Sequence, residues 1–305
     1  MSNLEAASLM TIRPRRSVLY LPASNARALE KARTLPVDAL ILDLEDAVAP
    51  EAKEMARDQL AAALQEGGFG KREVVVRVNA LETPWGADDV AAVAKLGADA
   101  ILFPKINTAE DVLKAVAALD AAGAPADLPI WIMAETPRCI MGMDAIAGAS
   151  PRLTCLVAGT SDLSRDLRAR PAPGRIGVIS ALSIIVIAAR AHGLDALDGV
   201  HLDMNDDAGY LAACEQGRDL GFDGKTLIHP KQIPGANAAF APSVAEIEQG
   251  KAIVAAWAEA RAAGKGICVL NGKLIEKLHV EDAERLLALH AAILERGEGS
   301  ASAAA

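Results

Sequence analysis

Carboxylates that follow short apolar stretches are the side chains of this sequence best suited to chemistry. Glu135 and Asp162 each come shortly after such a stretch. Two carboxylates at one point repel each other unless they share a proton or a cation. A hard cation such as Mg²⁺ takes one or two carboxylates with waters and substrate oxygens, and no His/Cys cluster offers a softer site. The pair is therefore a candidate magnesium site, although Asp162 as a helix cap and Glu135 paired with Arg138 would explain it equally well.

Arg77 and an acidic run at Asp43, Glu45 and Asp46 form a second candidate group. A buried arginine at a strand end is a fork-shaped donor for a carboxylate, so we favour substrate binding by Arg77. The alternative is that Arg77 pairs with Glu45 or Asp46. Ser161 lacks the GxSxG sequence of a serine hydrolase, and none of the five histidines has a zinc-type partner.

Eight stretches of strand-like composition alternate with Ala-rich helical segments, and these elements must position the side chains above. Most of the strands are continuous apolar runs, which is typical of a parallel sheet covered by helices. Eight β-α units in roughly 220 residues predict an α/β fold, a (β/α)8 TIM barrel, whose catalytic groups lie at the carboxyl ends of the strands. A doubly wound sheet is the alternative, but the glycines expected after its first strand are absent. The expected strands are residues 17–21, 39–43, 74–78, 100–104, 130–134, 155–159, 196–201 and 224–228.

The sequence after the eighth strand departs from the repeat, because prolines interrupt it. We expect a loose leader at residues 1–13, the barrel at 14–235, a C-terminal lid extension at 236–296 and a disordered tail at 297–305. Within the extension, the pattern predicts a long helix, a short β-type piece, a turn at Asn271 and Gly272, and a last helix.

The composition argues against several classes of protein. There are 31 basic and 40 acidic residues, a net charge of −9, and only 3% aromatic residues, so we expect no nucleic-acid partner. The longest apolar run, residues 176–189, is shorter than the roughly 20 residues of a membrane span and predicts a buried helix, so we expect no membrane partner. Four separated cysteines and no secretory signal favour a cytoplasmic protein with reduced thiols.

Seven short motifs now stand out in order along the chain. They lie at residues 16–20, 42–48, 77–79, 104–105, 135–137, 159–163 and 224–230. With this order and spacing, the sequence from about Arg16 to Ile293 resembles the citrate lyase beta-subunit-like family of the HpcH/HpaI aldolase superfamily. That family includes malyl-CoA and citramalyl-CoA lyases.

The resemblance implies a TIM barrel that binds Mg²⁺, with Mn²⁺ as a substitute, and a CoA thioester. It implies homotrimers or hexamers in which the C-terminal segment reaches a neighbour's active site. It assigns the metal ligands to Glu135 and Asp162, the substrate carboxylate to Arg77, and metal-bound waters to Glu45 and Asp46. The implied CoA-side contacts are Arg16, Tyr20, Lys31, Ile228 and Pro230.

Three positions depart from the family pattern. Ala23 and Asn25 stand where a glycine and a common arginine are expected near the CoA contacts. Glu276 stands where the lyases carry a catalytic aspartate on the lid, and it adds about 1.5 Å of reach, enough to alter catalysis. As a structural alternative, Glu276 is an acid at a helix N-terminus.

The expected activity is a Mg²⁺-dependent carbon–carbon lyase. It would cleave a 3-hydroxyacyl-CoA, such as (S)-malyl-CoA or citramalyl-CoA, into acetyl-CoA and a 2-oxo acid through a thioester enolate. The alternative is a (3S)-malyl-CoA thioesterase, because the lid motif of such relatives resembles residues 276–279. Further alternatives are a citrate lyase beta subunit acting on an acyl-carrier-protein thioester, and a non-catalytic binding subunit.

Overall fold

The computed structural model describes residues 12–297. Except for residues 12, 13 and 297, the expected leader and tail lie outside the described residues. The described chain divides into two compact units, Arg15–Phe240 and a C-terminal unit at residues 241–297 with residues 12–14. The division follows Phe240 rather than residue 235, because Ile233, Ala236 and Phe240 pack into the core of the first unit.

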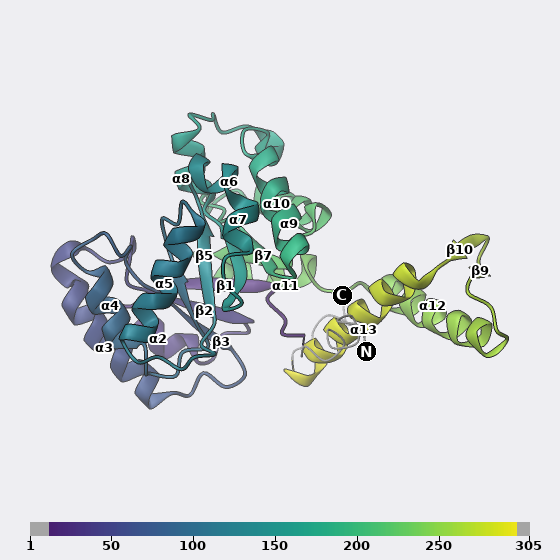
Figure 1. Ribbon diagram of the computed structural model, residues 1–305, viewed down its shortest axis with the longest axis horizontal. Coiled ribbons are helices and arrows are strands. Elements are labelled where there is room, and N and C mark those ends of the chain that lie inside the picture. The colour runs from purple at the N-terminus through teal and green to yellow at the C-terminus, as the bar shows by residue number, and fades with distance from the viewer. Residues whose placement is uncertain (1–11, 298–305) are drawn as a thin grey trace. The chain divides into compact units, whose positions relative to one another are not determined.

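The first unit is a closed barrel of eight parallel strands in chain order (Figure 1). β8 pairs with β1 through Thr226 and Val18, which closes the barrel. The TIM-barrel prediction is thus confirmed, and the doubly wound alternative is excluded. The seventh strand is shorter than expected and ends at Asp198. The strands are β1 (Ser17–Pro22), β2 (Ala39–Asp43), β3 (Glu73–Arg77), β4 (Ala100–Phe103), β5 (Ile130–Ala134), β6 (Leu153–Ala158), β7 (Asp195–Asp198) and β8 (Gly224–Leu227).

Alternate strand residues pack on opposite faces of the barrel wall, which explains the continuous apolar runs. Ile41, Leu102 and Trp131 belong to a cluster inside the barrel. Their neighbours Leu40 and Ile101 belong to the larger cluster that packs with the surrounding helices. Both faces are therefore buried, as in other parallel sheets covered by helices.

Helices follow the strands and ring the barrel (Figure 1). They are α2 (Ala26–Ala32), α3 (Lys53–Glu66), α4 (Gly86–Val93), α5 (Ala109–Ala121), α6 (Pro137–Met141), α7 (Met143–Ala147), α8 (Thr160–Asp166), α9 (Ile179–His192), α10 (Asp207–Leu220) and α11 (Ile233–Ala239). Short 3₁₀ turns at Pro50–Ala52, Pro173–Arg175 and Pro230–Gln232 precede three of these helices.

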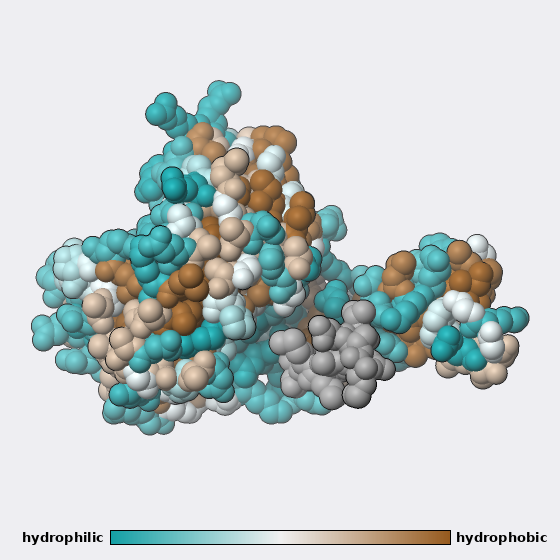
Figure 2. Space-filling model, viewed as in Figure 1, coloured by the Kyte–Doolittle hydropathy of each residue, from teal (hydrophilic) through white to brown (hydrophobic). Residues whose placement is uncertain are grey.

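The long apolar run of the sequence forms α9, as expected, but the helix is not wholly buried. Ile187 is 67% exposed, and Ile184 and Leu211 of α10 are also exposed. Figure 2 shows brown, apolar side chains on the part of the surface where α9 and α10 lie. Within residues 12–297, no helix has the length and apolar character needed to cross a membrane.

The C-terminal unit consists of two long helices and a hairpin. α12 (Val244–Ala262) packs beside α13 (Lys277–Glu295), and β9 (Cys268–Leu270) pairs antiparallel with β10 (Lys273–Ile275). The turn between these strands holds Asn271 and Gly272 at φ 51° and 76°, the left-handed conformation that an Asn-Gly hairpin turn requires. The predicted hairpin is confirmed.

Candidate active site

Arg77 and Asp43 end neighbouring strands and form a buried ion pair. Arg77 Nε and Nη2 donate to the two carboxylate oxygens of Asp43 at 2.6 and 2.7 Å. Nη1 lies 2.7 Å from Glu45 Oε2. The backbone N–H groups of Glu45 and Ala47 also donate to Asp43, which fixes the loop after β2. In the sequence, Asp43 stands out only as part of an acidic run. In the structure, its carboxylate accepts hydrogen bonds from both Arg77 and the loop after β2.

Glu45 lies beside Arg77, and the pKa of its carboxyl group is shifted. Burial raises its pKa to about 8, even though Arg77 acts in the opposite direction. Glu45 Oε2 is buried, and its ion pair with Arg77 Nη1 lacks the geometry of a hydrogen bond. This oxygen is therefore suited to accept a further hydrogen bond from a bound water or ligand. Asp46, the next residue, is exposed.

Tyr20 lies beneath Arg77. The guanidinium carbon of Arg77 is 4.8 Å from the centre of the Tyr20 ring, within range of a cation–π interaction. The Tyr20 hydroxyl donates to Met133 Sδ at 3.3 Å. Tyr20 packs against the cluster inside the barrel, and burial raises its pKa. The Tyr20 ring therefore helps to position the Arg77 guanidinium, in addition to any contact that Tyr20 makes with a cofactor.

Glu135 and Asp162 follow β5 and β6, which are neighbours in the barrel, and their carboxylates meet. Glu135 is 3% exposed, and burial raises its pKa. Burial also acts to raise the pKa of Asp162, but hydrogen bonding and charge from Lys105 hold it below its ordinary value. A side chain at Gly159 would overlap Glu135, so the glycine at the end of β6 lets the two carboxylates approach.

Lys105 joins this pair, although in the sequence it stands out only as part of the motif at residues 104–105. Its backbone N–H donates to Glu135 Oε1 at 2.7 Å, and its Nζ lies 3.3 Å from the same oxygen. Lys105 Nζ also forms an ion pair with Asp162. Asp162 Oδ1 faces Arg165 Nη1 at 2.9 Å. The structure therefore brings together the predicted metal ligands with a lysine between them.

The donor set at Glu135 and Asp162 fits a hard divalent cation. Mg²⁺ prefers oxygen ligands and binds through one or two carboxylates while waters and substrate complete its octahedron. No group of three or more His, Cys, Asp or Glu residues within residues 12–297 forms a closed metal cage. A two-carboxylate site leaves coordination positions open for substrate, which is the arrangement a catalytic metal requires.

A buried chain of polar residues supports the loop that carries Glu45. Lys53 Nζ donates to the carbonyl oxygens of Leu44 and Glu45 and to Asn79 Oδ1 at 2.7 to 2.8 Å. Asn79 Nδ2 donates in turn to Asp89 Oδ2 at 2.6 Å. Lys53 and Asp89 belong to none of the sequence motifs, and both lie in helices. Only the fold brings them beneath the loop.

Arg16 lies away from the other predicted site residues. It precedes β1, at the amino end of the barrel strands, and is 4% exposed. Its side chain donates from Nε and Nη2 to the two oxygens of Asp38 at 2.8 and 2.9 Å, and its backbone N–H donates to Asp38 at 2.8 Å. A contact with CoA does not fit this arrangement. Arg16 ties β1 to β2, and we do not retain it in the proposed site.

Two of the remaining predicted CoA-side residues, Ile228 and Pro230, follow the carboxyl end of β8, and Ile228 is 38% exposed. Lys31 is an exposed residue in the last turn of α2, the helix that follows β1. Gln232 joins the loops after β7 and β8. Its Oε1 accepts from the Ile228 N–H, and its Nε2 donates to the His201 carbonyl, both at 3.0 Å. No sequence motif marks Gln232.

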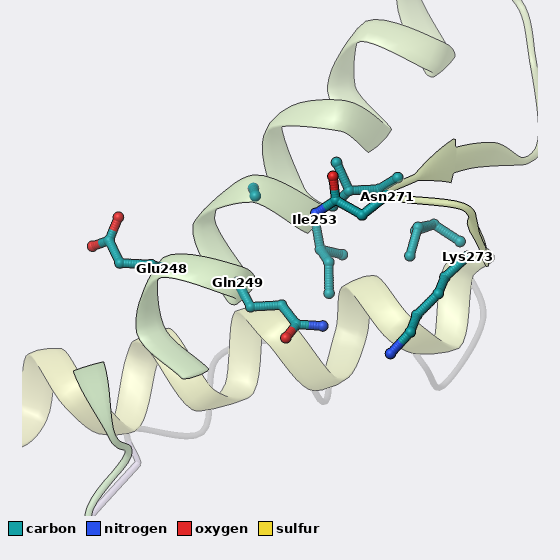
Figure 3. Close-up of a pocket in the computed structure, with 8 residues that line it drawn as sticks. Glu248, Gln249, Ile253, Asn271 and Lys273 are labelled. Atoms are coloured by element: carbon teal, nitrogen blue, oxygen red, sulfur yellow. The ribbon is translucent and has the colours of Figure 1, made fainter. Parts of the chain in front are cut away.

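Glu276 belongs to the C-terminal unit, where it is the exposed N-cap residue of α13. Its backbone N–H donates to His279 Nδ1 at 3.1 Å. The same unit holds a cavity of about 320 Å³ between α12 and the hairpin. Gln249 and Ile253 of α12 and Asn271 and Lys273 of the hairpin border it (Figure 3). None of the residues predicted to do chemistry lines this cavity.

Comparison with known proteins places this geometry in a family. The family model described as HpcH/HpaI aldolase/citrate lyase matches residues 16–230. The chain belongs to this family. The match spans the barrel from the start of β1 to the loop after β8, so it includes Arg77, Glu135 and Asp162. The resemblance drawn from the seven motifs is confirmed.

Two kinds of named relatives match nearly the whole chain. A protein of Cereibacter sphaeroides strain KD131 named (3S)-malyl-CoA thioesterase is 50% identical over 280 residues, which cover 92% of this chain and 96% of that protein. The citrate lyase subunit beta of Escherichia coli K12 is 37% identical over 280 residues, covering 90% and 93%. These relatives are enzymes of the family, which supports action on a CoA ester but leaves the reaction open between hydrolysis and cleavage of a carbon–carbon bond.

A solved structure shares the fold. The CitE protein of Mycobacterium tuberculosis, in complex with magnesium, acetoacetate and coenzyme A, superposes with a TM-score of 0.73 at 29% identity. The match covers 92% of this chain and all of that one. Magnesium in this neighbour is in keeping with the donor chemistry at Glu135 and Asp162.

Proposed function

We propose that the protein is a Mg²⁺-dependent thioesterase that hydrolyses (3S)-malyl-CoA to malate and free CoA. The observation that carries this proposal is the 50% identity, over 92% of the chain, to a protein named for that reaction. The sequence by itself favoured a carbon–carbon lyase and kept the thioesterase as the alternative. Because of the 50% identical relative, we place hydrolysis first and carbon–carbon cleavage second.

The chain's own residues have distinct roles in this reaction. Glu135 and Asp162 hold the metal, with Mn²⁺ as a substitute for Mg²⁺, and Arg77 orients the carboxylate of the malyl group. Two of the five N–H groups of Arg77 donate to Asp43, and Nη1 faces Glu45, so the outer N–H groups of Nη1 and Nη2 are available to a substrate. When bound, the metal polarises a substrate oxygen and stabilises the charge that develops on it.

Proton transfer to and from water is assigned to carboxylates. Glu276 accepts a proton from the water that attacks the thioester carbonyl, so that the carbon–sulfur bond breaks and CoA leaves as its thiol after protonation. Glu45 Oε2, buried beside Arg77, accepts a hydrogen bond from a water held in the site, and Asp46 accepts one from a second water. Tyr20, Lys31, Ile228 and Pro230 contact the CoA.

A carbon–carbon lyase is the second candidate. The 37% identity to a citrate lyase subunit beta, and a neighbour crystallised with magnesium, acetoacetate and coenzyme A, favour it. In this reaction the same residues would hold a 3-hydroxyacyl-CoA, and Glu276 would give a proton to the enolate carbon. Malyl-CoA would then yield glyoxylate and acetyl-CoA.

Product analysis separates the two reactions. Purified protein with (3S)-malyl-CoA and Mg²⁺ is expected to release free CoA and malate without glyoxylate. Glyoxylate and acetyl-CoA in equal amounts would instead establish the lyase. Glu135→Ala and Asp162→Ala should each abolish Mg²⁺-dependent turnover, whereas Asp120→Ala on the surface of α5 should not. Full turnover in both site variants would reject the metal assignment.

We also expect the chain to form a homo-oligomer, a trimer or hexamer, in which Glu276 of one copy serves the barrel of another. The exposed apolar side chains Ile187 of α9 and Leu274 and Leu278 around Glu276 support burial against a second copy. Sedimentation of the purified protein tests this. A cytoplasmic location stays a prediction.

A further inference from the structure

Lys105 has an unusual backbone conformation directly after β4. Its φ is 56°, in the left-handed region that residues with a Cβ atom seldom adopt. In this conformation its backbone N–H reaches Glu135 Oε1 at 2.7 Å. Such conformations cost free energy and persist where the surrounding structure holds them, often at functional sites. The backbone of Lys105 therefore holds one predicted metal ligand.

The side chain of Lys105 turns to the same place. Its ammonium forms ion pairs with both Glu135 and Asp162, and it is about one-third exposed. These two neighbours have a combined charge of −2 when ionised, and the ammonium offsets half of it. Arg165 lies on the other oxygen of Asp162, Oδ1, and so does not occupy the space between the carboxylates. The Lys105 ammonium thus pairs with the carboxylate oxygens that would bind a divalent cation.

We infer that Lys105 is a built-in cation that fills the metal position in the metal-free protein, and that Mg²⁺ binds by displacing its ammonium. The inference rests on the magnesium site of the proposed function. Two carboxylates in contact repel each other, and a cation between them offsets that repulsion. Lys105 supplies that cation while the metal is absent.

Displacement requires only the side chain to move. The backbone N–H of Lys105 holds Glu135 in either state, because it does not depend on the position of the ammonium. The ammonium is partly exposed, so it has solvent to move into. A direct consequence is that Lys105 weakens metal binding, since each metal ion must first break the ion pairs of Lys105.

Metal affinity without substrate is the property to measure. Lys105→Met keeps an unbranched side chain close to the length of the lysine stem while removing the charge. We expect it to lower the dissociation constant for Mn²⁺ by roughly ten- to hundredfold, the equivalent of a hydrogen bond between charged groups. Mn²⁺ binding is followed by electron paramagnetic resonance of the free ion, and Mg²⁺ binding by competition. Lys105→Gln is a second variant, should the first fail to fold.

The controls separate this inference from the metal site itself. Lys114→Met removes a lysine that pairs with Glu110 on the surface of α5, and should leave the affinity unchanged. Glu135→Gln should abolish binding in the wild-type and Lys105→Met backgrounds. Equal or weaker Mn²⁺ binding by both Lys105 variants, with binding still dependent on Glu135, would overturn the role of Lys105 alone. Binding that is absent, or that persists in Glu135→Gln, would overturn the metal site and the inference with it.

Discussion

Replacing Arg77 with lysine tests whether the shape of the guanidinium, and not only its charge, serves the substrate. Arg77 makes two parallel hydrogen bonds to Asp43, at 2.6 and 2.7 Å, and faces Glu45 with its third nitrogen. A lysine ammonium is a point charge on a shorter stem and reaches one of these groups at a time. It cannot stay on Asp43 and also present two N–H groups to a substrate carboxylate.

The expected loss follows from the contacts. Arg77→Lys gives up at least one hydrogen bond between charged groups on the substrate side, which is worth about 1.5–3 kcal/mol. At about 1.4 kcal/mol per tenfold change, kcat/KM for (3S)-malyl-CoA should fall about ten- to hundredfold. The loss of the second bond to Asp43 should also lower the free energy of unfolding, so folding must be checked by circular dichroism.

The assay follows the CoA thiol with a colorimetric disulfide reagent under steady-state conditions. Arg152→Lys is the matched control, because Arg152 pairs with Asp120 and the Leu128 carbonyl before β6, at the amino end of the barrel strands. It should keep kcat/KM within about threefold of the wild type. A folded Arg77→Lys protein that also stays within threefold would refute substrate binding by Arg77.

Three further outcomes are expected. Asp38→Ala removes the acceptor of two hydrogen bonds from the buried Arg16 guanidinium and should lower the free energy of unfolding in urea by about 3–5 kcal/mol, without changing KM; an unchanged unfolding midpoint would contradict the structural role of Arg16. Burial raises the folded-state pKa of Glu45 to about 8, so its protonated form stabilises the fold fully below its unfolded pKa near 4.5, and this contribution is lost as the pH rises toward 8. Glu45→Gln should therefore reduce the decline in unfolding free energy between those pH values, and an unaltered decline would exclude Glu45 as its source. Glu276→Asp shortens the lid carboxylate and should reduce hydrolysis by about tenfold or more, because a displacement of ~1 Å costs roughly 100-fold; undiminished release of CoA would remove Glu276 from the mechanism.

Local sequence determined the strands, the hairpin and the family. Continuous apolar runs predicted strands buried on both faces, and their number and spacing predicted the barrel, because each β-α unit carries its own pattern. Asn271 and Gly272 specified the hairpin, because their left-handed conformation is a local property. The carboxylates after β5 and β6 were found in the same way, since neighbouring parallel strands end at the same edge.

Tertiary structure alone decided which of these residues act as partners. Lys105 and Asp162 are far apart in sequence, and only the closed barrel brings the ammonium between the two carboxylates. Lys53 belongs to no sequence motif, and burial beneath the loop after β2 makes it a support for Glu45. Arg16 matched a family motif, yet its pairing with Asp38 gives it a structural role. Sequence patterns report how a residue relates to its own helix or strand, whereas charge pairing depends on distances between separate elements, which only the packed barrel fixes.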